Sequence, residues 1–156
     1  MVGQFTQEVL FPDGRRRTFH GRFWIKGDRT RWDYSGEDGQ TVITIGRDVY
    51  IYDPFAGQVQ EGKLEFPVVY SSIFKNPREL AKFFNIKEEG LKLVLTPKRE
   101  GQVKRVVVLL DGKLNVKGIK VVDAAGSTTS LSFSQIKYNQ EVDPKIFSLK
   151  ELERRR

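Results

Sequence analysis

The side chains best suited to covalent or acid–base chemistry are few in this sequence, and their spacing predicts no catalytic site. His20 is the single histidine of the 156 residues and lies in a run typical of a strand. A serine hydrolase would need an acid and a serine beside it, and no local pattern supplies them. The carboxylate pairs Glu37–Asp38 and Glu88–Glu89 fall in turn-like segments, where solvation is the simpler interpretation.

Metal and phosphate chemistry is equally poorly supported. The chain has no cysteine, so disulfides and thiolate chemistry are excluded. A lone histidine cannot provide the spaced His/Cys sets that bind zinc. Neither a glycine-rich phosphate-binding loop nor a Gly-x-Ser-x-Gly elbow is present. No run of 18 apolar residues predicts a transmembrane helix, and no signal peptide is visible at the start. We therefore expect a binding protein without a metal or cofactor.

The charge of the chain allows an acidic partner. The formal net charge is +7, and Arg15–Arg17 and Arg154–Arg156 are basic clusters. Such a charge suits nucleic acid, an anionic membrane surface or an acidic protein, and it also suits a plain solvated surface. Nucleic-acid binding would combine basic residues with exposed aromatic platforms. Here the aromatic residues alternate with charges in a way that buries them, so we expect no nucleic acid.

The stretch Gly21–Tyr34 is the most informative part of the sequence. Phe23 and Ile25 alternate with polar residues, and Trp32 and Tyr34 do so after a short connection. Period-2 alternation is typical of strands in a sheet with one dry and one solvated face. We expect the sheet to curl around this dry face and to form an apolar trough. The plainer alternative is a filled core.

Turn signals recur about every ten residues along the chain, which is a strand-and-turn spacing. Short connections favour an antiparallel meander, in a mainly β, α+β protein with one domain over residues 1–156. The predicted strands are Phe5–Phe11, Thr18–Lys26, Thr30–Ser35, Gln40–Ile45, Val49–Asp53, Gln58–Leu64, Leu91–Pro97, Val103–Asp111, Leu114–Asp123 and Ser127–Tyr138.

Two short apolar helices are predicted in the middle of the chain. Asn76–Glu79 carries a helix start signal, with Asn at the N-cap, Pro at the first position and Glu at the third. Leu80, Phe83 and Phe84 then share one helix face. Pro67–Phe74 can form a further turn or two. Both helices need an apolar surface to cover, and the dry face of the sheet offers one. The charged tail, residues 148–156, is a frayed helix or a solvated end.

Several motifs in order resemble the outer-membrane lipoprotein carrier proteins, LolA. The likeness extends over about residues 4 to 147, and each motif alone is weak. The motifs are Phe5–Gln7, Gly21–Lys26, Arg31–Tyr34, Gly46–Phe55, Leu93–Lys98, Val121–Gly126 and the strand Thr128–Phe133.

The resemblance implies both a fold and a function. LolA proteins fold as an unclosed antiparallel β-barrel, a half-barrel, whose concave face is lined by aromatic residues and covered by short lid helices. They are periplasmic, and they are neither enzymes nor cofactor-dependent. They accept acylated lipoproteins from an inner-membrane ATP-binding cassette complex and shield the acyl chains. They then pass the cargo to an outer-membrane lipoprotein receptor.

The resemblance also predicts which residues contact lipid. The strand residues are expected to line the trough, and the helix residues to contact it from the lid. The lining residues are Phe23, Ile25, Trp32, Tyr34, Ile51, Leu93, Leu131 and Phe133, and the lid residues are Val69, Ile73, Leu80 and Phe84. Because Arg31 alternates with Trp32, we expect Arg31 on the solvated face, where Arg31→Glu would leave acyl binding intact.

The sequence departs from the family pattern in three places. Only Met1–Gln4 precede the first strand, where relatives begin with a helix, so we expect either a more open trough or one filled by a segment of a partner. Relatives often have Arg-Pro after the strand that ends at Lys26, and the arginine helps to hold the lid closed. This chain has Gly27–Asp28 at that place, and Arg29 is the nearest arginine. Relatives often carry an additional C-terminal strand, which the charged tail of this chain does not predict. Two alternatives remain open: a lipid- or lipoprotein-sensing module of the same fold, and a basic nucleic-acid-binding β protein.

Overall fold

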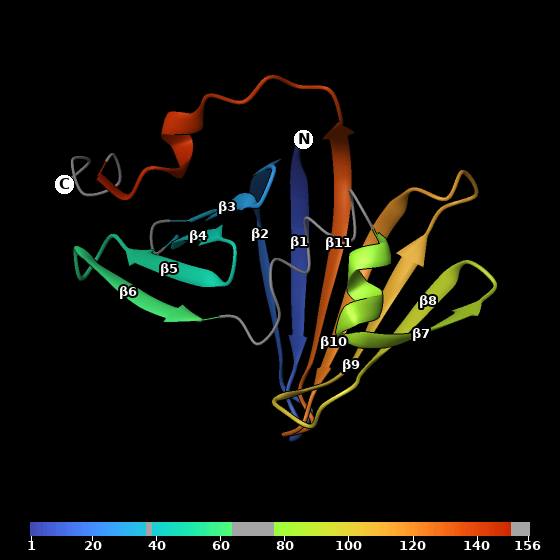
Figure 1. The fold of residues 1–156 in the computed structure, drawn as a ribbon. Helices are drawn as coiled ribbons and strands as arrows, with labels where there is room; N and C mark the ends of the chain where they lie inside the picture. The colour runs from blue at the N-terminus through green and yellow to red at the C-terminus, as the bar shows by residue number, and fades with distance from the viewer. Residues whose placement is uncertain (37–38, 64–76, 151–156) are drawn as a thin grey trace. The chain divides into compact units, whose positions relative to one another are not determined.

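The chain folds into two compact units, each described by itself. The computed structural model describes residues 1–36, 39–63 and 77–150, with the backbone alone for residues 77–79. Unit 1 comprises Met1–Gln4, His20–Ser71 and Gln135–Arg156, and unit 2 comprises Phe5–Phe19 and Ser72–Ser134. Figure 1 shows β1 (Val2–Leu10), β2 (Arg16–Lys26) and β11 (Thr128–Lys137) as long strands, and each passes from one unit into the other.

The strands form an 11-stranded sheet, in the order β6-β5-β4-β3-β2-β1-β11-β10-β9-β8-β7. The order ends at β6 and β7, which do not pair with each other, so the antiparallel sheet is unclosed and the predicted fold class is confirmed. The strands are β1 (Val2–Leu10), β2 (Arg16–Lys26), β3 (Arg29–Tyr34), β4 (Thr41–Ile45), β5 (Asp48–Asp53), β6 (Gln58–Lys63), β7 (Phe84–Glu89), β8 (Lys92–Pro97), β9 (Val103–Leu110), β10 (Val116–Asp123) and β11 (Thr128–Lys137).

Glycine closes two of the tight connections that the sequence indicates. Gly27 begins the connection between β2 and β3 with φ 62°, and Gly46 begins that between β4 and β5 with φ 62°. Two-residue hairpin connections favour turns with positive φ, because their twist matches that of the flanking strands. Glycine adopts such φ values without steric cost. These turns fix which residues of β2 and β3 lie opposite one another.

The helix predicted from Asn76 onward is wrong in type and extent. A short 3-10 helix, η1 (Pro77–Lys82), takes its place, and Phe83 N donates to Leu80 O at 3.0 Å. Phe84 is the first residue of β7, a strand that the sequence did not predict, and it pairs with Pro97 of β8. Pairing with β8 satisfies the backbone of residues 84–89, which a continued helix would have to satisfy internally. Phe84 is therefore a strand residue and not a lid-helix residue.

Some expectations fall on parts of the chain outside the described residues. They are the helix at 67–74 with Val69 and Ile73, the carboxylate pair Glu37–Asp38, and the basic cluster Arg154–Arg156. The beginning of the charged tail is described. A second 3-10 helix, η2 (Pro144–Phe147), precedes it, with Asp143 as N-cap accepting a bond from Lys145 N. In the described part of the chain, no helix is long and apolar enough to cross a membrane.

The two terminal strands of the sheet are polar. In β6, all residues but Val59 are exposed, and the strand includes Glu61 and Lys63. In β7, all residues but Phe84 are exposed, and the strand includes Lys87, Glu88 and Glu89. Apart from Phe84, the buried apolar side chains of the sheet lie on inner strands. In unit 1 they include Phe23, Trp32, Ile43 and Tyr52, and in unit 2 Leu95, Val106, Val108, Ile119 and Leu131.

Candidate functional site

One face of unit 1 carries a row of aromatic and aliphatic residues across four strands. Strand register aligns Phe23 of β2 with Trp32 of β3, Trp32 with Val42 of β4, and Val42 with Ile51 of β5. The Phe23 and Trp32 rings stack, with centroids 5.1 Å apart and planes 24° from parallel. Offset stacking adds about 0.5–1.5 kcal/mol to the apolar burial of the pair. This row is the face predicted by alternation.

A hydroxyl pair holds the Trp32 ring in place. Trp32 Nε1 donates to Thr30 Oγ1 at 3.0 Å. The Thr30 hydroxyl also pairs with that of Thr44 on β4, and both threonines are buried. A buried hydroxyl or indole N–H costs free energy unless it finds a partner, and these three groups satisfy one another. The indole of Trp32 is thus oriented from its own strand and from the neighbouring one.

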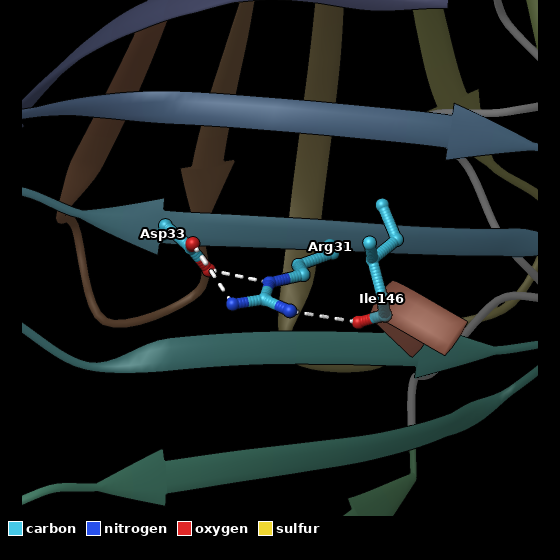
Figure 2. A network of polar contacts seen from close by, with 3 residues as sticks. All are labelled: Arg31, Asp33 and Ile146. Carbon is cyan, nitrogen blue, oxygen red and sulfur yellow. Dashed lines mark hydrogen bonds and ion pairs between the residues drawn. The ribbon is translucent and has the colours of Figure 1, made fainter. Parts of the chain in front are cut away.

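The opposite face of unit 1 is not solvated at Arg31, and this expectation is wrong. Figure 2 shows the Arg31 guanidinium between Asp33 and the backbone of Ile146. Nε and Nη2 of Arg31 donate to the Asp33 carboxylate at 2.8 and 3.0 Å, and Nη1 donates to Ile146 O at 2.9 Å. The residue is 5% exposed. A bidentate ion pair and a carbonyl bond compensate this burial.

The C-terminal segment, residues 142–149, covers this second face. Lys26 Nζ donates to Val142 O at 3.3 Å, and Phe147 is 2% exposed. Leu149 packs against the buried pair Ile43 and Tyr52. Alternation alone predicted solvent here, because the covering residues lie more than a hundred positions further along the chain. Arg29 alternates with Arg31 and lies on this face, opposite to Trp32.

Unit 2 has an apolar face of its own. Strand register aligns Leu131 of β11 with Ile119 of β10, Ile119 with Val108 of β9, and Val108 with Leu93 of β8. Phe133 lies on the same side as Leu131 by alternation and is half-buried. These positions form one apolar row across four strands.

A pocket of about 300 Å³ opens on this face of unit 2. Its volume is at the lower end of the range of small-molecule sites. Leu80 of η1 lines it together with sheet residues, so η1 lies over the face. The lining residues are Leu80, Glu88, Gly90, Leu93, Val108, Leu110, Leu114 and Val116.

Sequence reasoning missed several residues of this pocket. Val108 and Leu110 belong to the run Val106–Leu110, which is apolar at every position. Period-2 alternation gives no information in such a run, because both faces of the strand look equally apolar. Leu114 was unexpected for another reason: it is 68% exposed and has φ 63°, an uncommon conformation for leucine.

The predicted lipid-contact residues therefore divide into two sets. Each set lies on one face of its own unit, and its role in lipid binding stays a prediction. Unit 1 holds Phe23, Ile25, Trp32, Tyr34 and Ile51, and unit 2 holds Leu80, Phe84, Leu93, Leu131 and Phe133. Val69 and Ile73 lie outside the described residues.

Polar chemistry is sparse in the described ranges. No group of three or more His, Asp or Glu side chains there could hold a metal ion. One carboxylate has a shifted pKa. The backbone N–H groups of Asn115 and Lys113 donate to Asp111 Oδ1 at 2.9 Å each, and the Asn115 bond contributes most to lowering the pKa of Asp111. Asp111 stabilises the β9–β10 turn in this way.

Sequence comparisons point to one protein family. Residues 1–150 match the family model described as outer membrane lipoprotein carrier protein LolA. An outer-membrane lipoprotein carrier protein of Xanthomonas campestris pv. campestris is 32% identical in an alignment of length 149 that covers 88% of this chain and 71% of that protein. The Neisseria meningitidis protein of the same name is 26% identical over 153 residues, 93% of this chain and 73% of that protein.

Solved structures share the fold at low sequence identity. A LolA superfamily protein from Nitrosomonas europaea aligns with a TM-score of 0.54 and 14% identity, covering 96% of this chain and 90% of its own. A DUF1329 family protein from Desulfovibrio piger aligns with a TM-score of 0.51 and 14% identity, covering 97% and 90%. The family match over residues 1–150, with the unclosed antiparallel sheet, settles membership. The chain belongs to the outer membrane lipoprotein carrier protein LolA family.

Proposed function

We propose that this chain is a periplasmic carrier that shields the acyl chains of lipoproteins on their way from the inner to the outer membrane. The observation that carries the proposal is the family match over residues 1–150, since the relatives described above are named outer-membrane lipoprotein carrier proteins. The carrier acts without covalent chemistry. It receives cargo from an inner-membrane ATP-binding cassette complex and passes it to an outer-membrane receptor.

The apolar faces of the two units support the proposal physically. Each buried methylene of an acyl chain is worth about 0.8 kcal/mol, so an acylated protein does not cross water unaided. The pocket beneath Leu80 offers apolar contact with no buried charge in its floor, where Val108 and Val116 are buried. Such contact is non-directional and therefore suits cargo with varied proteins attached.

Release is as necessary for a carrier as capture. In unit 1, the Trp32 side chain is 5% exposed and Phe23 is fully covered. An acyl chain that reaches this pair must displace the atoms that cover it in this structure. Cargo contacts then replace apolar contacts of the same kind, and the net affinity is a small difference between large terms. A small net affinity lets a receptor remove the cargo.

The proposal is tested by titration with a triacylated lipopeptide. The fluorescence of Trp24 and Trp32 reports binding to the purified chain, and a non-acylated peptide of the same sequence is the control. We expect saturable binding of the lipopeptide that hardly changes with salt. Binding of an oligonucleotide, weakened steeply by salt, would instead indicate the nucleic-acid alternative.

The transport step needs a second measurement. Inner-membrane vesicles that contain the lipoprotein-releasing complex and a labelled lipoprotein are supplied with ATP. We expect soluble labelled lipoprotein to accumulate only when the chain is added. Lipopeptide binding without such release would contradict the carrier role and favour the sensing module.

A further inference from the structure

Three connections of unit 2 meet at one end of that unit. Ala124 N, in the β10–β11 turn, donates to Gln102 O of the β8–β9 connection at 2.8 Å. Gly126 of the same turn lies against the β1–β2 connection, where a Cβ built on it would be 3.5 Å from Pro12 Cγ. Figure 1 shows these connections gathered at the lower end of the strands. They form one continuous surface.

This surface is basic. We name it the basic end, and it consists of Arg15, Arg16, Arg17, Lys98, Arg99 and Lys104, all exposed. Internal contacts orient the first part of it. Arg15 Nε lies 2.6 Å from Asp13 Oδ2, Arg16 Nη1 lies 3.5 Å from Glu8 Oε1, and the Arg17 guanidinium lies 5.3 Å from the centroid of the Phe19 ring.

In the second part of the basic end, three cations lie around one carboxylate, that of Glu100. Among the described residues, no acidic side chain pairs with Lys98, Arg99 or Lys104. These three line a pocket of about 410 Å³ together with Glu100 and Ala124 of the neighbouring turn. An excess of positive charge at one surface raises the local potential and attracts anions.

We propose that the basic end binds the anionic headgroup surface of a phospholipid bilayer. A bilayer fits better than an acidic protein because of what the basic end lacks. Protein interfaces have a core of large apolar or aromatic anchors. The large apolar side chains that are exposed in the described ranges are Phe55, Ile86, Leu91, Leu114 and Tyr138, and none belongs to the three connections. Headgroup binding needs only charge, at about 1 kcal/mol for each Lys or Arg near the surface.

The proposal is tested by co-sedimentation of the intact chain with vesicles. One set is equal parts phosphatidylglycerol and phosphatidylcholine, and the other is phosphatidylcholine alone. We expect binding to the first set only. This binding should weaken between about 50 mM and about 300 mM salt, because the Debye length shortens as the salt concentration rises. Equal binding to both sets, or none to either, would overturn the proposal. Binding to polyglutamate but not to vesicles would assign the surface to an acidic protein instead.

Matched variants locate the binding surface. The triple variant Lys98→Glu, Arg99→Glu, Lys104→Glu reverses the charge of these three cations, and we expect it to bind anionic vesicles at least about tenfold more weakly. The control variant Lys92→Glu, Lys113→Glu, Lys117→Glu makes the same change in net charge at exposed sites outside the basic end. Equal loss in both variants would show a response to net charge alone and overturn the proposal.

Folding and cargo binding are monitored separately. If circular dichroism shows that the triple variant is unfolded, the glutamine versions of the same three positions replace it. The vesicles contain no acylated protein, so their result is independent of the proposed carrier function. A chain that binds lipopeptide but not anionic vesicles retains the first proposal and loses this one.

Discussion

Arg31 Nη1 donates to the carbonyl oxygen of Ile146 at 2.9 Å, joining β3 to a residue 115 positions further along the chain. The same guanidinium holds the Asp33 carboxylate with its other two nitrogens (Figure 2). One side chain therefore fastens the C-terminal segment to the face of β3 opposite Trp32. It does so from a position that alternation alone would place in solvent.

Replacing Arg31 tests this attachment. We expect Arg31→Met to lower the free energy of unfolding by about 2 kcal/mol, because Ile146 O and Asp33 both lose a charge-assisted partner. We also expect trypsin to cleave after Lys145 faster than in the unchanged chain. Urea unfolding and limited proteolysis measure the two effects.

The control for this variant lies two residues away. Arg29 is on the same strand and the same face but is exposed. Arg29→Met should change the free energy of unfolding by no more than about 0.5 kcal/mol. If Arg31→Met behaves like Arg29→Met, the Arg31 contacts contribute nothing measurable to holding the C-terminal segment.

Two neighbouring residues of β8 test whether lipopeptide binding depends on the pocket itself or on apolar surface in general. Leu93 lines the unit 2 pocket, whereas Val94 faces the other side of the same strand, and both are half-buried. We expect Leu93→Glu to weaken lipopeptide binding at least about tenfold, since it places a charge among apolar side chains. Val94→Glu should bind nearly as tightly as the unchanged chain. The fluorescence titration measures both, and equal weakening would contradict the assignment of the pocket.

Gly118 is required by close packing behind the same pocket. A Cβ added there would lie 2.9 Å from the Leu131 carbonyl oxygen, which is backbone and cannot easily move. Gly118→Ala should therefore cost about 1–3 kcal/mol in free energy of unfolding. Gly112→Ala is the matched control, because nothing lies within 4 Å of its added Cβ. Similar midpoints in urea for both variants would contradict this prediction.

The β9–β10 turn should make stability depend on pH. The Asn115 and Lys113 N–H groups hold the pKa of Asp111 below its ordinary value of 3.8. A lowered folded-state pKa contributes stability above the unfolded-state pKa, and this contribution is lost as the pH falls through the folded-state pKa. We expect Asp111→Ala to lower the Tm at pH 7 and to differ less from the unchanged chain in strong acid. A constant difference in Tm at all pH values would exclude this role.

Alternation and turn chemistry were sufficient to predict most of the sheet. The row Phe23, Trp32 and Ile51 was predicted because polar residues alternate with it and glycine turns fix the register. The strand β7 was missed because Leu80, Phe83 and Phe84 have helical spacing. Pairing between Phe84 and Pro97 overrode this local preference.

Other parts of the candidate site required the structure. Val108 and Leu110 lie in an apolar run that does not indicate which face is inward. The burial of Arg31 depends on Ile146, and a contact across such a separation leaves no periodic trace in either segment. Local patterns describe faces of strands, whereas the covering of a face is decided by tertiary contacts.

The polar character of the terminal strands β6 and β7 affects how the chain behaves at high concentration. An unclosed sheet has two unpaired edge strands, and such edges can pair with other copies of the chain and form fibres. Such pairing would dehydrate charged side chains on both edge strands. These are Glu61 and Lys63 of β6, and Lys87 and Glu89 of β7. The charged side chains of the two terminal strands therefore oppose edge-to-edge association of the unclosed sheet.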